Sequence, residues 1–326
     1  MREHLVPGVQ CALCVDGRST RSLAIGAADL STGRVLTCDT QFLLASLSKP
    51  VTALVVLELA SQGAIQLDTL IADIVDAKWA NSMQEGLSRA TIRQLLMHSA
   101  NIPYRDSQMF PVELIVEGRR EEMQLEPTTV DEFLAQTVTI EHSRTYTGRG
   151  YMILQQIMER HFDRPFAQIV HSNLPGRLAQ ICDFSVASAC DSAVARDHNE
   201  QGSILPQLWT PSVAASGMVG TAADLVDAMK YALSQRHRSY FNSLFHNAFV
   251  SECPYTCGLH LRRDRDERVL DHGAARPGMR GVLKVIPDAG IVFVMLANGA
   301  NGLQVIKPLI GLLEELGLAR LSLQTD

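Results

Sequence analysis

The sequence lacks any stretch that could cross a membrane or direct export. Its most apolar segment, residues 51–60, is interrupted by Thr52 and Glu58 and is far shorter than the roughly 20 residues that a membrane span needs. The first residues lack the apolar core and the small-residue cleavage site of a secretory signal. We therefore expect a cytoplasmic protein with no membrane partner.

The sequence also lacks an excess of positive charge. The 326 residues carry a formal net charge of -6, and no run of like charges suggests a surface for nucleic acid. We therefore expect no nucleic-acid partner. Only five of the 29 basic residues are lysines, so a lysine beside a candidate nucleophile stands out.

The cysteines do not suggest a disulfide framework or a metal site. They number seven, an odd count, and are spread along the chain as reduced cytoplasmic thiols are. Cys11 and Cys14 lie in an apolar run typical of a strand, where positions three apart face opposite sides. Neither this pair nor Cys253 and Cys257 has a His pair at zinc-finger spacing. We expect no metal and no other cofactor.

Strand patterns occur near both ends of the chain. Residues 6–26 contain two apolar segments around a turn at 16–17, and residues 282–296 contain two around a turn at 287–290. The second turn has the sequence Pro-Asp-Ala-Gly, which is typical of a tight reversal. Each segment pair predicts an antiparallel hairpin.

Helical patterns fill most of the remaining sequence. Residues 49–62 are apolar on nearly all sides, which predicts a buried helix that ends at Gly63. Thr221, with Asp224 three residues later, has the pattern of a capping box and predicts a helix that runs to about residue 234. Further helices are predicted at 92–98, 130–137, 150–161, 165–178 and 303–318.

These patterns predict an α/β (α+β) fold in which both termini build one sheet with flanking helices. We expect residues 1–70 and 205–326 to form this sheet domain and residues 71–204 to form an inserted, mainly helical domain. No repeat or low-complexity linker divides the chain.

The tetrad Ser46-Leu47-Ser48-Lys49 stands at the start of the predicted buried helix. A Ser hydroxyl is a weak nucleophile until a base takes its proton, and a desolvated Lys one helical turn later can do this. The spacing predicts Ser46 as a nucleophile and Lys49 as its base. A helix-capping Ser followed by a Lys on the helix surface would give the same residues, so the surrounding sequence must decide.

Further segments match, in order, the landmarks of the serine β-lactamase and penicillin-binding-protein-like superfamily. The sequence resembles its class C β-lactamase and esterase branch over nearly the whole chain, and ordered matches are more specific than one tetrad. The resemblance implies the β-lactamase-like fold, with an antiparallel sheet built from both termini. The matching segments lie at 6–8, 26–29, 42–49, 63–68, 92–103, 146–151, 215–225 and 272–274.

The resemblance also implies roles for individual residues. Tyr146 would exchange protons with Lys49, because a nearby cation favours a phenolate, although a half-buried tyrosine that leads a helix is the alternative. His272 would border the site and hydrogen-bond Tyr146 or the substrate, and a surface histidine on a strand is the alternative. The backbone N–H groups of Ser46 and Ala275 would form the oxyanion hole.

Two positions depart from the pattern of the branch. Gly148 stands where β-lactam-binding members carry an Asn amide that helps to hold the substrate, and Gly offers neither donor nor acceptor there. Ala274 replaces the last Gly of the third motif, and its methyl is expected to narrow the cleft or shift the edge strand. Esterases and transesterases of the superfamily also depart at the first position. We interpret the following Arg276 and Arg280 as solvated loop residues rather than ligands of a substrate carboxylate.

The sequence therefore predicts a serine hydrolase that acts on a small-molecule ester or thioester through an acyl-enzyme on Ser46. An esterase and an acyl transferase share every one of these residues. A β-lactamase and a catalytically idle relative that binds a ligand remain alternatives. No nucleophile elbow, zinc-protease helix, phosphate-binding loop or dinucleotide fingerprint competes.

Overall fold

The described part of the structure covers most of the chain. The computed structural model describes residues 1–15, 17–82, 85–100, 102, 109–112, 117, 146–181, 193–234, 254–264 and 267–315. The predicted helix at 130–137 and Cys253 lie outside these residues. Within them, no helix is long and apolar enough to cross a membrane. In the same residues, no group of three or more His, Cys, Asp or Glu side chains is placed to hold a metal ion.

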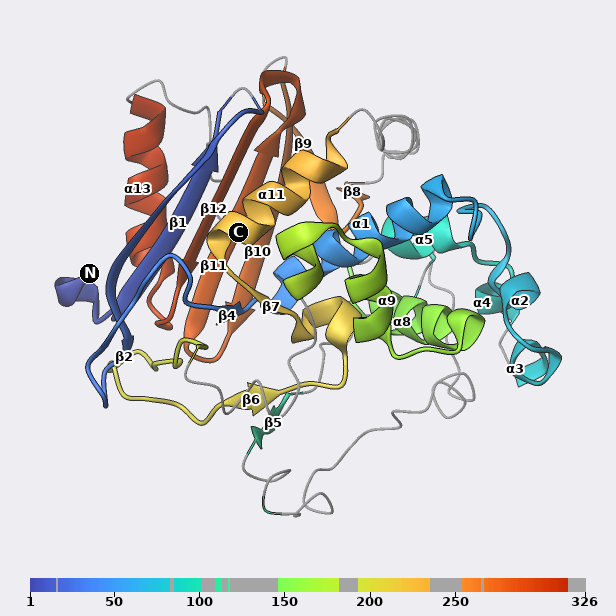
Figure 1. Ribbon diagram of the computed structural model, residues 1–326, viewed down its shortest axis with the longest axis horizontal. Helices are drawn as coiled ribbons and strands as arrows, with labels where there is room; N and C mark the ends of the chain where they lie inside the picture. The colour runs from blue at the N-terminus through green and yellow to red at the C-terminus, as the bar shows by residue number, and fades with distance from the viewer. Residues whose placement is uncertain are drawn as a thin grey trace.

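An eight-stranded sheet joins the two ends of the chain (Figure 1). Its order is β3-β2-β1-β12-β11-β10-β9-β8, and all neighbouring strands are antiparallel. β1 (Gly8–Cys14) pairs with β12 (Ile291–Ala297), so a sheet built from both termini is confirmed. The other strands are β2 (Thr20–Asp29), β3 (Arg34–Val35), β8 (Tyr255–Thr256), β9 (Leu259–Asp264), β10 (Glu267–Arg276) and β11 (Met279–Ile286).

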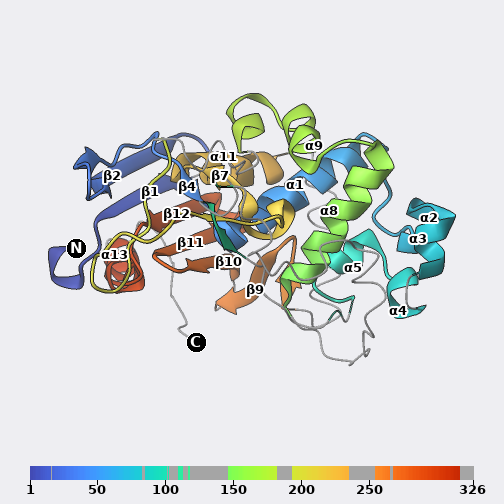
Figure 2. The same cartoon turned by 90° about the horizontal axis from the view of Figure 1, so that it is seen from below.

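Helices cover both faces of this sheet (Figure 2). Alternate residues of β12 point to opposite sides, as the pleat requires. Val292, Val294 and Leu296 join the apolar core that includes α11 (Ala222–Ala232), whereas Phe293 and Met295 pack with α13 (Leu303–Glu315). Burial on both faces explains why the strand is apolar throughout.

The predicted capping box at the start of α11 is confirmed. The Thr221 hydroxyl oxygen accepts from the Asp224 N–H at 3.1 Å, and an Asp224 carboxylate oxygen accepts from the Thr221 N–H at 2.9 Å. Two backbone donors of the first turn are thereby satisfied by local residues.

α1 (Ser48–Ser61) is the central helix of the molecule. Every residue from Ser48 to Ala60 is buried, as the sequence predicts, and Gly63 beyond its end has a left-handed φ of 74°. The helix contacts α11 on the sheet side and α9 on the other. The remaining helices of the described residues are α2 (Ile71–Ile74), α3 (Ala77–Ser82), α4 (Glu85–Ser88), α5 (Ile92–Leu96), α8 (Gly148–Phe162) and α9 (Phe166–Asn173).

Two predicted helices are shorter in the structure. The helix predicted at 165–178 is divided, because α9 ends at Asn173 and a 3-10 turn follows at Gly176–Gln180. Leu174 between them is extended, the conformation that a residue before proline prefers. The helix predicted at 92–98 ends at Leu96. The division into domains at residues 70 and 205 stays a prediction.

Candidate active site

Ser46 lies in a 3-10 turn, Ala45–Leu47, that leads directly into α1. Lys49 is one turn further along, and its Nζ donates hydrogen bonds to Ser46 Oγ at 3.2 Å and to the Ala215 carbonyl at 2.9 Å. The lysine side chain is only 2% exposed. The amine is therefore held in direct contact with the hydroxyl of the candidate nucleophile.

A π-helical turn, η5 (Val213–Gly217), supports the start of α1. Thr52 Oγ1 donates to the Ala214 carbonyl at 2.8 Å, next to the bond between Lys49 and Ala215. Ser48 Oγ accepts from the Met218 N–H at 3.1 Å. Three polar side chains of α1 are thus satisfied by one segment more than 160 residues away, and these hydrogen bonds fix the rotamer of Lys49. The sequence offered no signal for these carbonyl acceptors.

The residue before the nucleophile has a strained backbone. Ala45 has φ 47°, in the left-handed region that non-glycine residues seldom adopt. Its neighbour Leu44 is held by a hydrogen bond from its N–H to the Met218 carbonyl at 2.8 Å. Strain of this kind persists where the surrounding structure over-determines it and is common at functional sites.

Tyr146 lies two residues before the start of α8, and its side chain contacts Ser46. Its hydroxyl donates to Ser46 Oγ at 2.9 Å, and Lys49 Nζ lies 5.0 Å from the centre of its ring. Thr147, the N-cap of α8, accepts a hydrogen bond from the Arg149 N–H at 3.2 Å, which sets where the helix begins. Ser46, Lys49 and Tyr146 therefore form a compact group in which each member can exchange a proton with another.

His98, which the sequence analysis left without a role, lies beneath Tyr146. Its Nδ1 accepts a hydrogen bond from the Thr147 N–H at 3.3 Å, and its ring centre is 4.8 Å from that of Tyr146. Burial, reinforced by the charge of Lys49, holds the pKa of His98 well below its ordinary value. The ring is therefore neutral at neutral pH and acts as a hydrogen-bond acceptor.

His272 lies on β10 and is 5% exposed, so the alternative of a surface histidine is wrong. Its Nδ1 is 2.6 Å from the carbonyl of Gly273, which places the ring proton on Nδ1. Burial, followed by the charges of Lys49 and His260, lowers its pKa to about 3. Its ring centre lies 5.5 Å from that of Tyr146, but its buried Nε2 has no hydrogen-bond partner among the described residues. Of the two expected partners of His272, Tyr146 is therefore not hydrogen-bonded to it, and a hydrogen bond to the substrate stays a prediction.

The end of β10 presents a free edge to the site. β9 pairs with β10 only as far as Asp271, so among the described strands β11 alone pairs with residues 272–276. Pairing with β11 continues without a shift through Ala274, whose partner is Gly281. A Cβ at Gly281 would lie 3.2 Å from that of Ala274, so the glycine makes room for the alanine methyl. Of the two effects expected of Ala274, a shift of the strand does not occur, and a narrower cleft stays a prediction.

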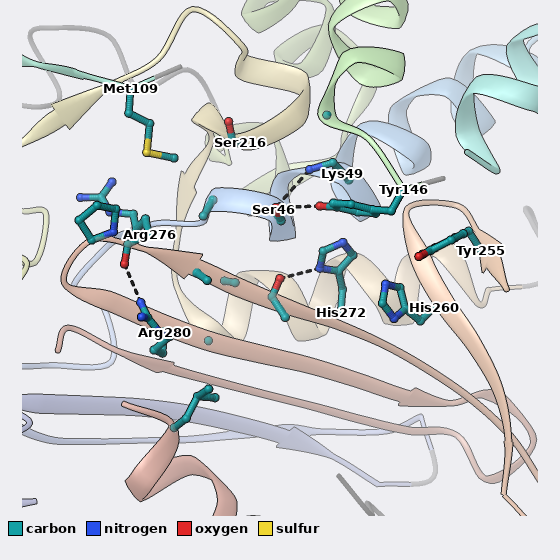
Figure 3. Close-up of a pocket in the computed structure, with 18 residues that line it drawn as sticks. Ser46, Lys49, Met109, Tyr146, Ser216, Tyr255, His260, His272, Arg276 and Arg280 are labelled. Atoms are coloured by element: carbon teal, nitrogen blue, oxygen red, sulfur yellow. Dashed lines mark hydrogen bonds between the residues drawn. The ribbon is translucent and has the colours of Figure 1, made fainter. Parts of the chain in front are cut away.

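One cavity of about 760 Å³ unites these groups (Figure 3). All seven residues that the sequence analysis selected line it, namely Ser46, Lys49, Tyr146, Gly148, His272, Ala274 and Ala275. The oxyanion-hole role of the Ser46 and Ala275 N–H groups stays a prediction. Residues that the sequence analysis did not select also line the cavity, including Met109, Ser216, Tyr255 and His260.

The interpretation of Arg276 as a solvated loop residue is wrong. Arg276 lines the cavity, is 6% exposed, and donates from Nε to Asp197 Oδ2 at 2.6 Å. Asp197 lies 79 residues earlier in the chain, so this partner was invisible to sequence reasoning. Arg280 also lines the cavity and is partly exposed.

The comparisons with known proteins agree with the fold. Penicillin-binding protein 4 of Amycolatopsis lactamdurans is 37% identical over 100 residues, which cover 31% of this chain and 26% of that protein. Esterase EstB of Burkholderia gladioli is 31% identical over 109 residues, which cover 32% of this chain and 26% of that protein. The matches thus span about a quarter of each curated relative. A class C β-lactamase structure from Rhodobacter sphaeroides aligns with a TM-score of 0.67 at 16% identity, over 91% of each chain.

The sequence model of one family extends over almost the entire chain. It carries the description Beta-lactamase and matches residues 1–312. The resemblance to the serine β-lactamase and penicillin-binding-protein superfamily is therefore confirmed. The chain belongs to the Beta-lactamase family.

Proposed function

We propose that this protein is a serine esterase or acyl transferase that forms an acyl-enzyme on Ser46. The observation that carries the proposal is the position of Ser46 Oγ, 3.2 Å from Lys49 Nζ and 2.9 Å from the Tyr146 hydroxyl. Nucleophilic catalysis by serine needs a group that takes the hydroxyl proton and one that returns a proton to the leaving group. The family includes serine hydrolases with esterase and penicillin-binding members, which supports this chemistry.

Acylation would proceed by attack of Ser46 Oγ on the carbonyl carbon of the substrate. Lys49 or Tyr146 takes the Ser46 proton while the carbonyl electron pair moves onto its oxygen. The Ser46 and Ala275 N–H groups would stabilise that oxyanion. When the intermediate collapses, the bond to the leaving oxygen or sulfur breaks, and Tyr146 returns the proton to that atom. Water or an acceptor alcohol or amine then attacks the acyl-enzyme by the same steps in reverse.

Two pocket residues support an ester or thioester as the substrate. Gly148 begins α8 at the wall of the cavity and offers no side chain to hold an acylamide. Ala274 occupies the strand edge beside Ser46 with its methyl packed toward Gly281. The cavity volume of about 760 Å³ fits a small molecule. We propose a small-molecule acyl substrate and a cytoplasmic location.

The test is turnover of p-nitrophenyl acetate and nitrocefin, together with intact-protein mass spectrometry after treatment with a fluorophosphonate. We expect ester turnover to exceed nitrocefin turnover, and a single covalent addition that Ser46→Ala abolishes. Ser61→Ala, at the opposite end of α1, is the matched control and should keep both turnover and labelling.

Each alternative has its own outcome in this test. Nitrocefin turnover above ester turnover would identify a β-lactamase. Absence of turnover and of labelling would identify a catalytically idle binding protein. Full ester turnover by Ser46→Ala would refute the proposed nucleophile.

A further inference from the structure

The cavity extends to both sides of Ser46, and the two ends differ in chemistry. Figure 3 shows Tyr146, His272 and His260 on one side of Ser46, with Arg276 and Arg280 on the other. Along an extended strand at about 3.3 Å per residue, His272 and Arg276 are separated by roughly 13 Å. A substrate held at Ser46 can therefore reach both ends only with different parts of its structure.

We propose that the end formed by Arg276 and Arg280 is a subsite for a carboxylate at the far end of the acyl group. The inference rests on the proposed acyl-enzyme chemistry, because that chemistry decides which part of the substrate lies at which end. Tyr146 hydrogen-bonds Ser46 Oγ and is the group placed to protonate the leaving atom. The leaving group must then lie on the tyrosine side, and the acyl chain extends toward the arginines.

Arg276 has a buried donor that the protein does not satisfy. Asp197 Oδ2 accepts from both Nε and Nη2, which fixes the plane of the guanidinium. The remaining nitrogen, Nη1, is buried and has no hydrogen-bond partner among the described residues. A buried unsatisfied donor is costly, and more so on a charged group. Burial lowers the pKa of Arg276 to about 9, so the group is still a cation at neutral pH.

Arg280 stands across the strand pair from Ala275 and adds a second cation. Its Nη1 donates to the carbonyls of Arg276 at 2.7 Å and of Met279 at 2.8 Å, which holds the side chain against the strand end. It makes no ion pair within the described part of the chain. Planar guanidinium groups bind carboxylates with paired, directional hydrogen bonds.

The charge balance of the cavity also favours an anion. The described residues that line it include Lys49, Arg276 and Arg280 but no Asp or Glu. Asp197 neutralises Arg276, and Arg280 remains for a ligand. In a partly desolvated cleft the potential of such a group selects an anionic ligand more strongly than it would in water.

The experiment compares two kinds of p-nitrophenyl ester that differ in one charge. The anionic series consists of the hemisuccinate, hemiglutarate and hemiadipate, and the neutral series consists of the same esters with the far carboxylate methylated. The readout is the ratio of kcat/KM for an anionic ester to that for its neutral partner. We expect the ratio to exceed one for the best chain length and to fall about 10- to 100-fold in Arg280→Gln. Loss of a hydrogen bond to a charged group typically weakens binding by a factor of this size.

Arg177→Gln is the matched control, because this arginine is 63% exposed and does not line the cavity. It removes the same charge and should leave the ratio as in the wild type. Arg276→Lys keeps the charge but loses the planar fork, and we expect it to lower the ratio while a thermal melt verifies folding. Should that variant fail to fold, Arg280→Gln decides the question.

Failure of the subsite and failure of the proposed function are distinguishable. If neither series is turned over and Ser46 is not acylated, the acyl-enzyme chemistry is wrong. If both series are turned over at equal rates, or if Arg280→Gln keeps the wild-type ratio, the carboxylate subsite is wrong and Arg276 serves only to anchor the strand end to Asp197.

Discussion

The buried histidine beside the nucleophile should make the protein sensitive to mild acid. Burial lowers the pKa of His272 to about 3, whereas an unfolded histidine titrates near 6.5. Between these values the unfolded chain binds a proton that the folded protein does not, so stability falls as the pH decreases. The stabilising contribution is fully present above about pH 6.5 and is lost progressively toward pH 3.

The size of this loss in stability follows from the difference between the pH and the pKa of the unfolded histidine. At pH 5, which is about 1.5 units below the unfolded pKa, His272 alone should reduce the free energy of unfolding by roughly 2 kcal/mol. His98, whose pKa is also held well below its ordinary value, acts in the same direction. The carboxylates with lowered pKa, such as Asp68 and Asp288, lose their stabilising contribution only below about pH 4. Between pH 7.5 and 5, the change in stability therefore reports on the histidines rather than on these carboxylates.

The assay is urea denaturation of the wild type and of His272→Gln at several values between pH 7.5 and 5. The variant lacks the titrating ring, so we expect its stability to fall less, and the difference between the two proteins to change by roughly 2 kcal/mol. His161→Gln, at an exposed position of α8, is the matched control and should follow the wild type. Parallel loss of stability in wild type and His272→Gln would refute the reasoning.

Two further substitutions test the site. Tyr146→Phe removes the hydroxyl 2.9 Å from Ser46 Oγ and should lower kcat for p-nitrophenyl acetate by about 100-fold or more with little change in KM. Tyr231→Phe, which removes a hydroxyl bonded to Glu58 outside the cavity, should not lower kcat, and equal kcat values in wild type and Tyr146→Phe would exclude the phenol from proton transfer. Gly258→Ala adds a Cβ that would lie 2.8 Å from the Cβ of Lys49, at a φ of +70°. Thermal melts should therefore show a larger loss of stability than for Gly63→Ala, where φ is similar but no atom lies within 4 Å of the added Cβ. Equal losses of stability in the two variants would mean that the close contact with Lys49 is relieved at no cost.

Features set by local chemistry are among those that the sequence predicted correctly. The capping box of α11 depends on two residues three positions apart, and the burial of α1 follows from apolar residues on all sides of one helix. The helix predicted at 165–178 was wrong for an equally local reason, since Pro175 breaks it.

The site divides in the same way. The sequence by itself determined that Ser46 and Lys49 meet, because one helical turn separates them, and the ordered motifs indicated that Tyr146 joins them. Only the tertiary structure placed the Ala215 carbonyl on Lys49, His98 beneath Tyr146, and Asp197 on Arg276. These contacts join segments that lie far apart in the chain, and their geometry is set by how helices and strands pack. No periodicity or spacing within one segment records that packing.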